Sequence, residues 1–278
     1  MPSEPAAQCR GVVRIYFSPS GEVHALKGVD AVLPAGSLTT ISGPSGSGKS
    51  SLLRILAAQD KPTAGTAEVA GQSLAGLSTR RLRALRRRHI GYVFPRPPDN
   101  LLAHLDVTEH LALAGRLRGL GRSVARSEGD ELLEVLEVLG LTERRTHRPA
   151  QLSGGAQQRL AFAQAVLGRP ALVVADEPTG ELDEATTHDL LGAVRTLTTR
   201  GSTVVLATHD PQAESVADQV LHMRSGTIAA EQVDGRRLAV IDADGRLQLD
   251  DAALELFPTR RVLVELDDDR TVRLRTPR

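Results

Sequence analysis

The sequence reads Gly43-Pro44-Ser45-Gly46-Ser47-Gly48-Lys49-Ser50 a short distance from its start. This run fits the phosphate-binding pattern G-x-x-x-x-G-K-[ST]. It lies where that pattern requires, after an expected strand ending at Ile41 and before an expected helix over residues 50–58. Glycines let such a loop fold around an anion with its N–H groups pointing inward, while the positive end of the helix faces the same anion. We therefore expect Lys49 to reach the β- and γ-phosphates of a nucleotide and the Ser50 hydroxyl to ligate Mg²⁺.

Strands and helices alternate through much of the chain. Short apolar segments bounded by turn residues predict strands over residues 12–17, 23–33, 38–41, 66–69 and 90–94. Continuous apolar runs predict buried strands over residues 171–175 and 203–207, and helical periodicity predicts helices over residues 153–167 and 184–199. Buried strands that alternate with helices indicate an α/β fold with a parallel sheet covered on both faces.

A helical insertion interrupts this alternation. Pro95, Pro97 and Pro98 forbid regular structure and lead into helical patterns over residues 107–118 and 124–139. Residues 95–168 are therefore expected to form a helical subdomain inserted into the α/β core.

Polar residues follow two of the buried strands. The strand over residues 171–175 leads directly into Asp176 and Glu177, and His209 follows the strand over residues 203–207. Ligands of open α/β sheets bind at the carboxyl edge of the strands. We expect Asp176 to hold Mg²⁺ there, directly or through water, and Glu177 to orient and deprotonate an attacking water. His209 is a candidate for contacting a γ-phosphate at the same edge.

Composition excludes several classes of protein. The chain has 278 residues, of which 41% are apolar, so it can bury a large core and is not intrinsically disordered. Its 34 basic and 34 acidic residues cancel, which removes the whole-protein electrostatic argument for binding nucleic acid or an anionic membrane. Any such contact would have to be local, and no nucleic-acid partner is expected.

The N-terminal residues carry no targeting signal. Residues 1–8 lack the basic and apolar segments of a secretory signal, and no apolar run approaches the roughly 18 residues that span a membrane. Cys9 is the only cysteine, so an intramolecular disulfide is excluded. We expect Cys9 to be an unreactive residue in a short tail over residues 1–10, and we expect a partner to supply any membrane contact.

The sequence also contains Leu152-Ser153-Gly154-Gly155-Ala156-Gln157-Gln158-Arg159. Because this string opens an expected helix, its N–H groups and serine hydroxyl form a second anion-binding end. With this string the chain closely resembles the ATP-binding subunits of ABC transporters over roughly residues 11–232. The string resembles the family's signature motif, Glu181-Leu182-Asp183 resembles its D-loop, and His209 resembles its switch histidine. The resemblance implies an ABC ATP-binding domain with a P-loop NTPase core.

The resemblance also implies ATP and Mg²⁺ as cofactors. In this family the signature motif meets the ATP of the opposite subunit, so the chain is expected to form a homodimer or to pair with a similar ATPase. The implied catalytic residues are Glu177 and His209, and the implied metal ligands are Ser50 and Asp176. The resemblance assigns adenine stacking to Tyr16, with the adjacent Phe17 as the alternative. The nucleotide-binding residues are then Tyr16, Gly43, Pro44, Ser45, Gly46, Ser47, Gly48, Lys49, Ser50, Ser51, Ser153, Gly154, Gly155, Gln157 and Asp183.

Three further strings are most similar to the lipoprotein-releasing and macrolide-exporter branch of the family. They cover residues 23–29, 175–180 and 208–211. Members of that branch work with permeases resembling the cell-division permease FtsX. The resemblance therefore implies a separate membrane permease as partner and a peripheral location on the cytoplasmic face of the cell membrane, and it does not specify a substrate.

The sequence departs from the family pattern at Pro95, which follows Phe94. The family has a glutamine there that ligates Mg²⁺ and transmits the nucleotide state to the permease. Three explanations are open: hydrolysis continues with water at the metal, ATP binds but turns over slowly, or coupling runs through Arg96 or Asp99. Gln164 also stands where the family usually has arginine, which we expect to alter packing only.

The last segment, residues 233–278, reads as a small β-rich module. Alternating patterns predict strands over residues 238–241, 246–249, 262–266 and 271–274, with a short helix over residues 251–257. The segment resembles the swapped-hairpin fold of AbrB-like regulators, which dimerise and often bind DNA. A slight excess of acidic residues over arginines disfavours DNA binding. A dimer-stabilising role, a regulatory role and a plain β-extension are all open.

Together these features predict the ATP-hydrolysing subunit of an ABC transporter, which drives a separate permease. Two alternatives are carried. One is an ATP-gated regulatory subunit with slow or no hydrolysis, motivated by Pro95. The other is a soluble ABC ATPase without a transport role, which would usually join two nucleotide domains in one chain.

Overall fold

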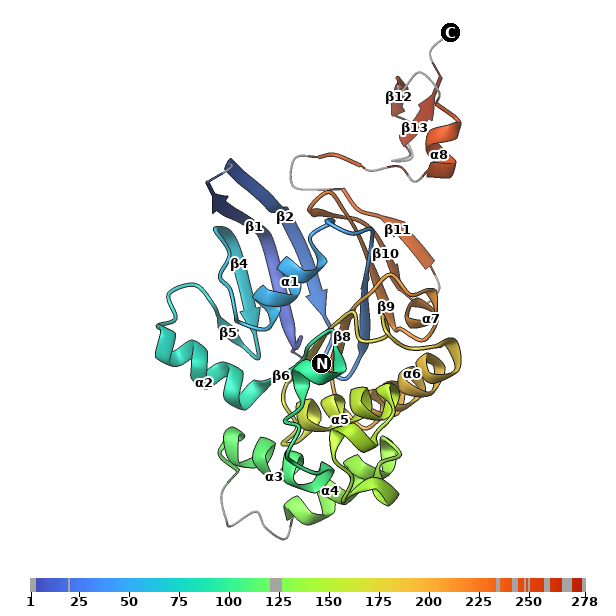
Figure 1. Cartoon of the computed structure of the whole chain (residues 1–278). Coiled ribbons are helices and arrows are strands. Elements are labelled where there is room, and N and C mark those ends of the chain that lie inside the picture. Colours follow the sequence, from blue (N-terminus) through green and yellow to red (C-terminus); the bar gives the residue numbers. More distant parts are fainter. Residues whose placement is uncertain are drawn as a thin grey trace.

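The computed structural model describes residues 4–19, 21–120, 127–233, 236–241, 245–247, 249, 251–257, 261–266 and 272–276. Figure 1 shows a small antiparallel sheet beside a larger central sheet, with helices α3 to α6 gathered at one end. Parts of three expected elements lie outside the described residues: the start of the helix expected at residue 124, Gln248 and Thr271.

The central sheet has the strand order β11-β10-β9-β3-β8-β7-β6. Its parallel strands are β9 (Gln219–Arg224), β3 (Leu38–Ser42), β8 (Val204–Ala207), β7 (Leu172–Asp176) and β6 (Ile90–Val93). The antiparallel strands β10 (Thr227–Val233) and β11 (Arg236–Ala239) extend one edge. The predicted parallel sheet is therefore confirmed at its centre.

Helices cover both faces of this sheet, as the side chains of β7 show. Leu172 and Val174 pack in the cluster that contains the leucines of α1, whereas Val173 and Ala175 pack in the cluster that contains α5 and α6. Successive side chains of a strand point to opposite faces, so each face of β7 meets a different set of helices. The helices of the core are α1 (Lys49–Leu56), α5 (Gly154–Val166), α6 (Glu184–Thr199) and α7 (Pro211–Ser215).

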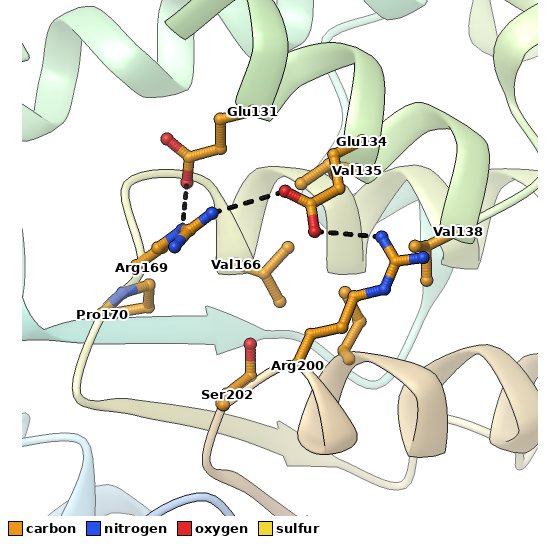
Figure 2. A pocket seen from close by; sticks show the side chains of 11 residues that line it. Glu131, Glu134, Val135, Val138, Val166, Arg169, Pro170, Arg200 and Ser202 are labelled. Atoms are coloured by element: carbon orange, nitrogen blue, oxygen red, sulfur yellow. Dashed lines mark hydrogen bonds and ion pairs between the residues drawn. The ribbon is translucent and has the colours of Figure 1, made fainter. Parts of the chain in front are cut away.

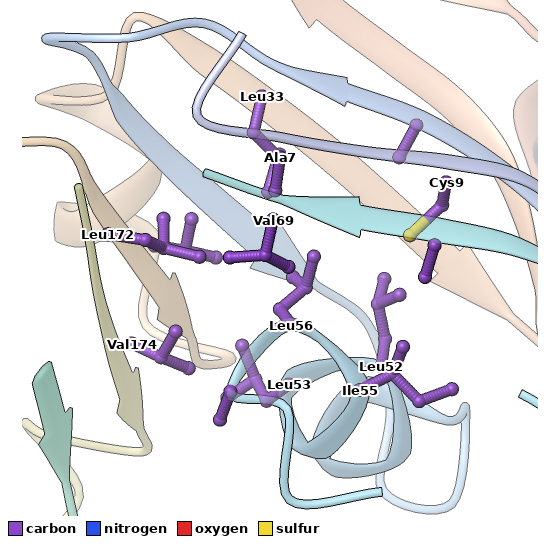
Figure 3. Packing of buried hydrophobic residues seen from close by; sticks show 14 of the residues in the cluster. Ala7, Cys9, Leu33, Leu52, Leu53, Ile55, Leu56, Val69, Leu172 and Val174 are labelled. Carbon is purple, nitrogen blue, oxygen red and sulfur yellow. The ribbon is translucent and has the colours of Figure 1, made fainter. Parts of the chain in front are cut away.

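The second sheet is antiparallel, with the order β2-β1-β4-β5. Its strands are β1 (Ala7–Ser18), β2 (Gly21–Leu33), β4 (Ala64–Val69) and β5 (Gln72–Ser73). Figure 3 shows the side chains of α1 packed between this sheet, which contributes Cys9 and Val69, and β7, which contributes Leu172 and Val174. The helix therefore joins the two sheets through one apolar cluster.

The N-terminal tail expected over residues 1–10 is wrong in its last part. Strand β1 begins at Ala7 and pairs with both β2 and β4, and Cys9 is buried in the cluster of Figure 3. Pairing on both sides satisfies the backbone groups of this segment, which a tail would leave to water. Burial, together with a smaller contribution from the nearby Asp30 carboxylate, raises the pKa of the Cys9 thiol to about 12.

The helical insertion contains α3 (Val107–Arg118) and α4 (Ser127–Val138) besides α5, and short 3₁₀ turns at Pro97–Asn100, Thr142–Arg144 and Pro149–Gln151. A capping box starts α3, because Asp106 accepts from the Glu109 N–H while Glu109 accepts from the Asp106 N–H. Before the insertion, α2 (Thr79–His89) leads into β6. Across the described part of the chain, every helix is too short or too polar to cross a bilayer.

The expected C-terminal module does not begin at residue 233. Strand β11 pairs with β10 and so belongs to the central sheet, with Val233 opposite Arg236. In the sequence, Asp-Gly, a dipeptide typical of two-residue hairpin turns, stands between the two strands. Beyond it lie an isolated bridge between Ile241 and Leu247, the short helix α8 (Asp251–Glu255) and a two-stranded sheet of β12 (Leu263–Leu266) and β13 (Val272–Arg275).

The burial of Cys9 predicts an inert thiol. With a pKa of about 12, roughly one thiol in ten thousand is ionised at about pH 8, and the thiolate is the reactive form. We expect no reaction of the folded chain with Ellman's reagent over minutes and full reaction of one thiol after unfolding in guanidinium chloride. Rapid reaction of the folded chain would place Cys9 in an exposed tail.

Candidate nucleotide site

The loop between β3 and α1 has a backbone that requires glycine at two of its positions. Gly43 and Gly48 have φ angles of 147° and 106°. A Cβ at Gly43 would lie 2.2 Å from the carbonyl oxygen of Met223, and one at Gly48 would lie 2.6 Å from that of Ala25. The loop is therefore wedged between the end of β9 and β2, where a side chain has no room.

The inner and outer parts of this loop differ in exposure. Pro44, Ser45 and Gly46 are exposed, whereas Ser47 is buried and its hydroxyl has no hydrogen-bond partner among the described residues. A buried hydroxyl without a partner is costly unless a ligand or water satisfies it. The loop thus offers an unused polar group where the sequence pattern places phosphate.

Lys49 is directed back into the loop. Its ammonium donates to the Gly43 carbonyl at 2.7 Å and to the Pro44 carbonyl at 3.4 Å, and it lies 3.5 Å from a carboxylate oxygen of Glu177. The side chain is about nine-tenths buried. A positive charge with so little water around it is stabilised by neighbouring anions and carbonyl dipoles, so it favours the binding of phosphate in the loop.

Ser50 and Asp176 lie together at the expected metal position. The Ser50 hydroxyl donates to the Asp176 carboxylate at 3.2 Å. Burial raises the pKa of Asp176, the hydrogen bond from Ser50 lowers it, and the neighbouring Glu177 raises it again. Both groups supply the hard oxygen donors that Mg²⁺ prefers, and Mg²⁺ on a nucleotide commonly uses one or two protein ligands beside phosphate and water. The described residues contain no larger group of histidine, cysteine or acidic side chains able to hold a metal.

Glu177 joins Lys49 to His209. One carboxylate oxygen faces Lys49, and the other lies 3.1 Å from Nδ1 of His209. Glu177 has a φ of 42°, a left-handed conformation that is strained for a residue with a side chain, and its N–H donates to Ala207 at 2.7 Å. The side chain of His209 is 75% exposed and that of Glu177 is 28% exposed, so the pair opens toward solvent.

The aromatic residues at the end of β1 differ in their contacts. The Tyr16 hydroxyl donates to Asp60 at 3.0 Å, and the guanidinium of Arg14 lies 4.5 Å from the centre of the Tyr16 ring. Phe17 is 74% exposed and points away from this cluster along the strand alternation. Adenine stacking by Tyr16 stays a prediction, with Phe17 as its alternative.

The signature string caps α5 and leaves its N-terminus exposed. The Ser153 hydroxyl accepts from the Ala156 N–H at 3.3 Å, as an N-cap residue does. Ser153 and Gly154 are exposed, whereas Gly155 is buried. A Cβ at Gly155 would lie 2.1 Å from the methyl group of Thr186, so glycine is required for α5 to approach α6.

Thr186 was not predicted from the sequence, yet it links two predicted site residues. Besides touching Gly155, it donates to Asp183 through its N–H at 2.8 Å and its hydroxyl at 3.0 Å. The backbone hydrogen bond from Thr186 is the main reason that the pKa of Asp183 lies below its ordinary value. Because Asp183 caps α6, its expected position at a partner's nucleotide depends on this threonine.

Two other predicted nucleotide-binding residues, Gln157 and Ser51, lie in the first turns of α5 and α1. The Gln157 amide donates to the carbonyls of Pro149 at 3.0 Å and Leu152 at 3.3 Å, which ties the start of α5 to the loop before it. Ser51, in the first turn of α1, is half-buried. Contact of either side chain with nucleotide stays a prediction.

The loop that contains Pro95 is organised by Asn100. The Asn100 side chain accepts from the Phe94 N–H at 2.8 Å and donates to the carbonyls of Phe94 at 3.1 Å and Arg96 at 3.0 Å. Gln164 in α5 donates to the Asn100 carbonyl at 3.2 Å. This hydrogen bond connects α5 to the loop, and the expectation that Gln164 alters packing only stays a prediction.

The pocket in Figure 2 lies at the opposite edge of the central sheet. It has a volume of about 200 Å³ and is lined by Arg169 and Pro170, which precede β7, and by Ser202, which precedes β8. Its charged side chains are paired, since Glu134 binds both Arg169 and Arg200. The residues that bear the predicted chemistry follow the other ends of the same strands, so this pocket is separate from the nucleotide site.

Known proteins resemble the chain over most of its length. Residues 26–180 match the family described as ABC transporter. The macrolide export ATP-binding/permease protein MacB of Shigella flexneri is 40% identical over 224 residues, which are 81% of this chain and 34% of that protein. The MacB of Hahella chejuensis is 37% identical over 231 residues, 83% of this chain and 35% of that protein. The chain thus spans about a third of the length of these relatives.

Solved structures share the fold. The dimeric structure of a post-hydrolysis state of the ATP-binding cassette MJ0796, bound to ADP and Pi, has a TM-score of 0.73 and 31% identity, and the match covers 83% of this chain and 99% of that one. The structure of CbiO1 from Clostridium perfringens has a TM-score of 0.73 at 24% identity and covers 82% of this chain and 88% of that one. Because the family model matches more than half of this chain's residues, the chain belongs to the ABC transporter family and is one of its ATP-binding cassettes.

Proposed function

We propose that this cassette hydrolyses ATP at a site shared by two chains and thereby drives a separate membrane permease. The observation that carries the catalytic part is the position of Glu177 between Lys49 and His209, beside the Ser50–Asp176 pair. A buried ammonium, two oxygen ligands and a carboxylate base within one edge of a sheet are the groups that phosphoryl transfer requires.

In this proposal each residue has a distinct part in the reaction. Lys49 would exchange its carbonyl partners in the loop for phosphate oxygens, and this would release the Glu177 oxygen that faces it. Glu177 can then accept the proton of an attacking water, while His209 contacts the γ-phosphate from the open side. Ser50 and Asp176 would hold Mg²⁺, which would supply charge neutralisation when bound.

The exposed start of α5 supports the pairing of two chains. Ser153 and Gly154 present backbone N–H groups and the positive end of the helix dipole to solvent, which favours an anion. Within the part of the chain that the structure describes, the hydrogen bonds and ion pairs of Lys49, Ser50 and Glu177 do not involve this helix end. A second chain, identical or similar, would place its nucleotide there, as the dimeric state named for the MJ0796 cassette suggests.

The relatives support a transport role. They are named as ATP-binding/permease proteins, and this chain matches about a third of their length. We infer from these names a permease partner resembling FtsX and a peripheral position of the cassette on the cytoplasmic face of the membrane. The transported substrate is a property of the permease and does not follow from the cassette.

Pro95 supports a second candidate, an ATP-gated regulatory subunit that turns over slowly. Proline offers no side-chain ligand to a metal, and Asn100 fastens the backbone on both sides of it. Such a loop would change its conformation less on nucleotide binding than a loop with a glutamine side chain at this position.

The first prediction concerns Glu177→Gln. The amide keeps the size of the carboxylate but cannot accept a proton from water, so we expect turnover to fall at least about 100-fold while ATP binding is retained. Phosphate release measures turnover, and size-exclusion chromatography with Mg²⁺ and ATP should show an accumulated dimer. Lys49→Ala is the control, and it should lose ATP binding itself. Full turnover by Glu177→Gln would refute the assignment of Glu177 as the base.

The second prediction concerns Pro95→Gln. Because Ser50 and Asp176 already form an oxygen pair and Asn100 orders the loop, we expect the unmodified chain to hydrolyse ATP and this variant to differ from it by less than about threefold, which is under about 1 kcal/mol in the barrier. Steady-state phosphate release measures both. Turnover that occurs only in Pro95→Gln would contradict the main proposal and favour the regulatory subunit.

A further inference from the structure

Helix α2 carries an exposed face of arginines. Its sequence, Thr79–His89, contains six arginines and no acidic residue, within a chain whose net charge is zero. Leu82 and Leu85 are buried and fasten the helix to the core, and Arg86 donates to the carbonyl of Ala58 at 2.5 Å. The other five arginines are exposed, at positions 80, 81, 83, 87 and 88.

These five side chains lie on one side of the helix. Successive residues of an α-helix are rotated by about 100°, so the five arginines fall within an arc of about 160°, away from the two buried leucines. The only other residue within that arc is Ala84, which is also exposed. Over its 11 residues the helix is about 16 Å long. The face defined by Arg80, Arg81, Arg83, Arg87 and Arg88, called here the arginine face, is therefore continuous.

Among the described residues, no acidic side chain forms an ion pair with the arginine face. None of the ion pairs between described residues involves its five members, whereas arginines elsewhere pair, as Arg195 does with Asp218 and Arg200 with Glu134. Helix α2 lies at the outer margin of the molecule near α3 (Figure 1), and a Cβ at Gly119 would lie 3.9 Å from the guanidinium of Arg87. The face is thus a local concentration of positive charge open to a partner.

The composition of the face selects among anionic partners. Protein interfaces depend on buried apolar or aromatic anchors, and this face offers only Ala84. Single-stranded nucleic acid is bound by aromatic platforms, and α2 contains no aromatic ring beyond His89 at its end. A bilayer with anionic lipids requires neither an apolar anchor nor an aromatic platform. Its attraction for a basic surface is the sum of the contributions of the individual arginines near the headgroups. The charge and the absence of anchors complement such a bilayer best.

We infer that the arginine face of α2 binds the anionic phospholipid headgroups of a membrane surface. This contact is additional to any permease and independent of nucleotide, because the face shares no residue with the loop at residues 43–50 or with Glu177. It gives the cassette a direct attraction to the bilayer although its net charge is zero.

The test is co-sedimentation of the full chain with vesicles of phosphatidylcholine containing about one third phosphatidylglycerol, beside vesicles of phosphatidylcholine alone. We expect binding to the anionic vesicles only, and its loss at about 1 M salt, where the Debye length is about 3 Å. The variant Arg80→Gln/Arg83→Gln/Arg87→Gln should lower the partition coefficient roughly 100-fold, at about one factor of five per arginine. Glutamine is a good helix former, so α2 is retained.

A matched control removes the same number of charges elsewhere. Arg144→Gln/Arg236→Gln/Arg261→Gln changes three exposed arginines outside α2 and should bind vesicles nearly as the unmodified chain does. Both variants should keep the thermal midpoint and ATP binding of the unmodified chain. Equal binding by the α2 variant, or equal losses in both variants, would overturn the inference. Stronger arginine-dependent binding to a DNA duplex than to the anionic vesicles would overturn it as well, because the face would then be a nucleic-acid site.

Discussion

Ile41, Ala207 and Asp176 stand in one row across the central sheet, at the carboxyl ends of β3, β8 and β7. Every group of the proposed reaction follows from this register. The phosphate loop leaves β3 just after Ile41, His209 follows Ala207 by two residues, and Glu177 follows Asp176 directly. A parallel sheet with both faces covered leaves only its edges open, so the residues that follow these strands are brought together.

Bringing these groups together is costly, and the structure shows how the cost is offset. Lys49 and Asp176 are mostly buried, and each would be unfavourable alone. Lys49 is stabilised by two carbonyls and by Glu177, and Asp176 accepts from Ser50. Glu177 adds a strained backbone, with a φ of 42°, that the hydrogen bond to Ala207 holds in place. Such an arrangement favours a polyanion, which would neutralise the buried ammonium of Lys49 and accept a hydrogen bond from the Ser47 hydroxyl, which has no partner among the described residues.

The sequence predicted the parts of the fold that depend on local pattern. Apolar runs and glycine spacing predicted β3, β7, β8 and the loop at residues 43–50. Buried strands require consecutive apolar residues, and positive φ angles favour glycine, so both features are visible in the sequence. Thr186 and Asn100 were missed, because their importance lies in contacts with Gly155, Asp183 and Gln164 that only packing reveals. The edge strand β11 was assigned to a separate module for a similar reason. Alternating apolar and polar residues predict a strand but do not indicate that it pairs with β10.

The central claim is that the nucleotide site of one chain is completed by a second chain. It is tested most directly by the steady-state rate of ATP hydrolysis per chain, measured with Mg²⁺ over a wide range of chain concentrations. If two chains share each site, the rate per chain should rise with concentration and reach a plateau once the dimer forms, and chelation of Mg²⁺ should abolish it. A rate per chain that is independent of concentration, in a sample that remains monomeric in solution throughout, would show that one chain completes the site alone and would contradict the account.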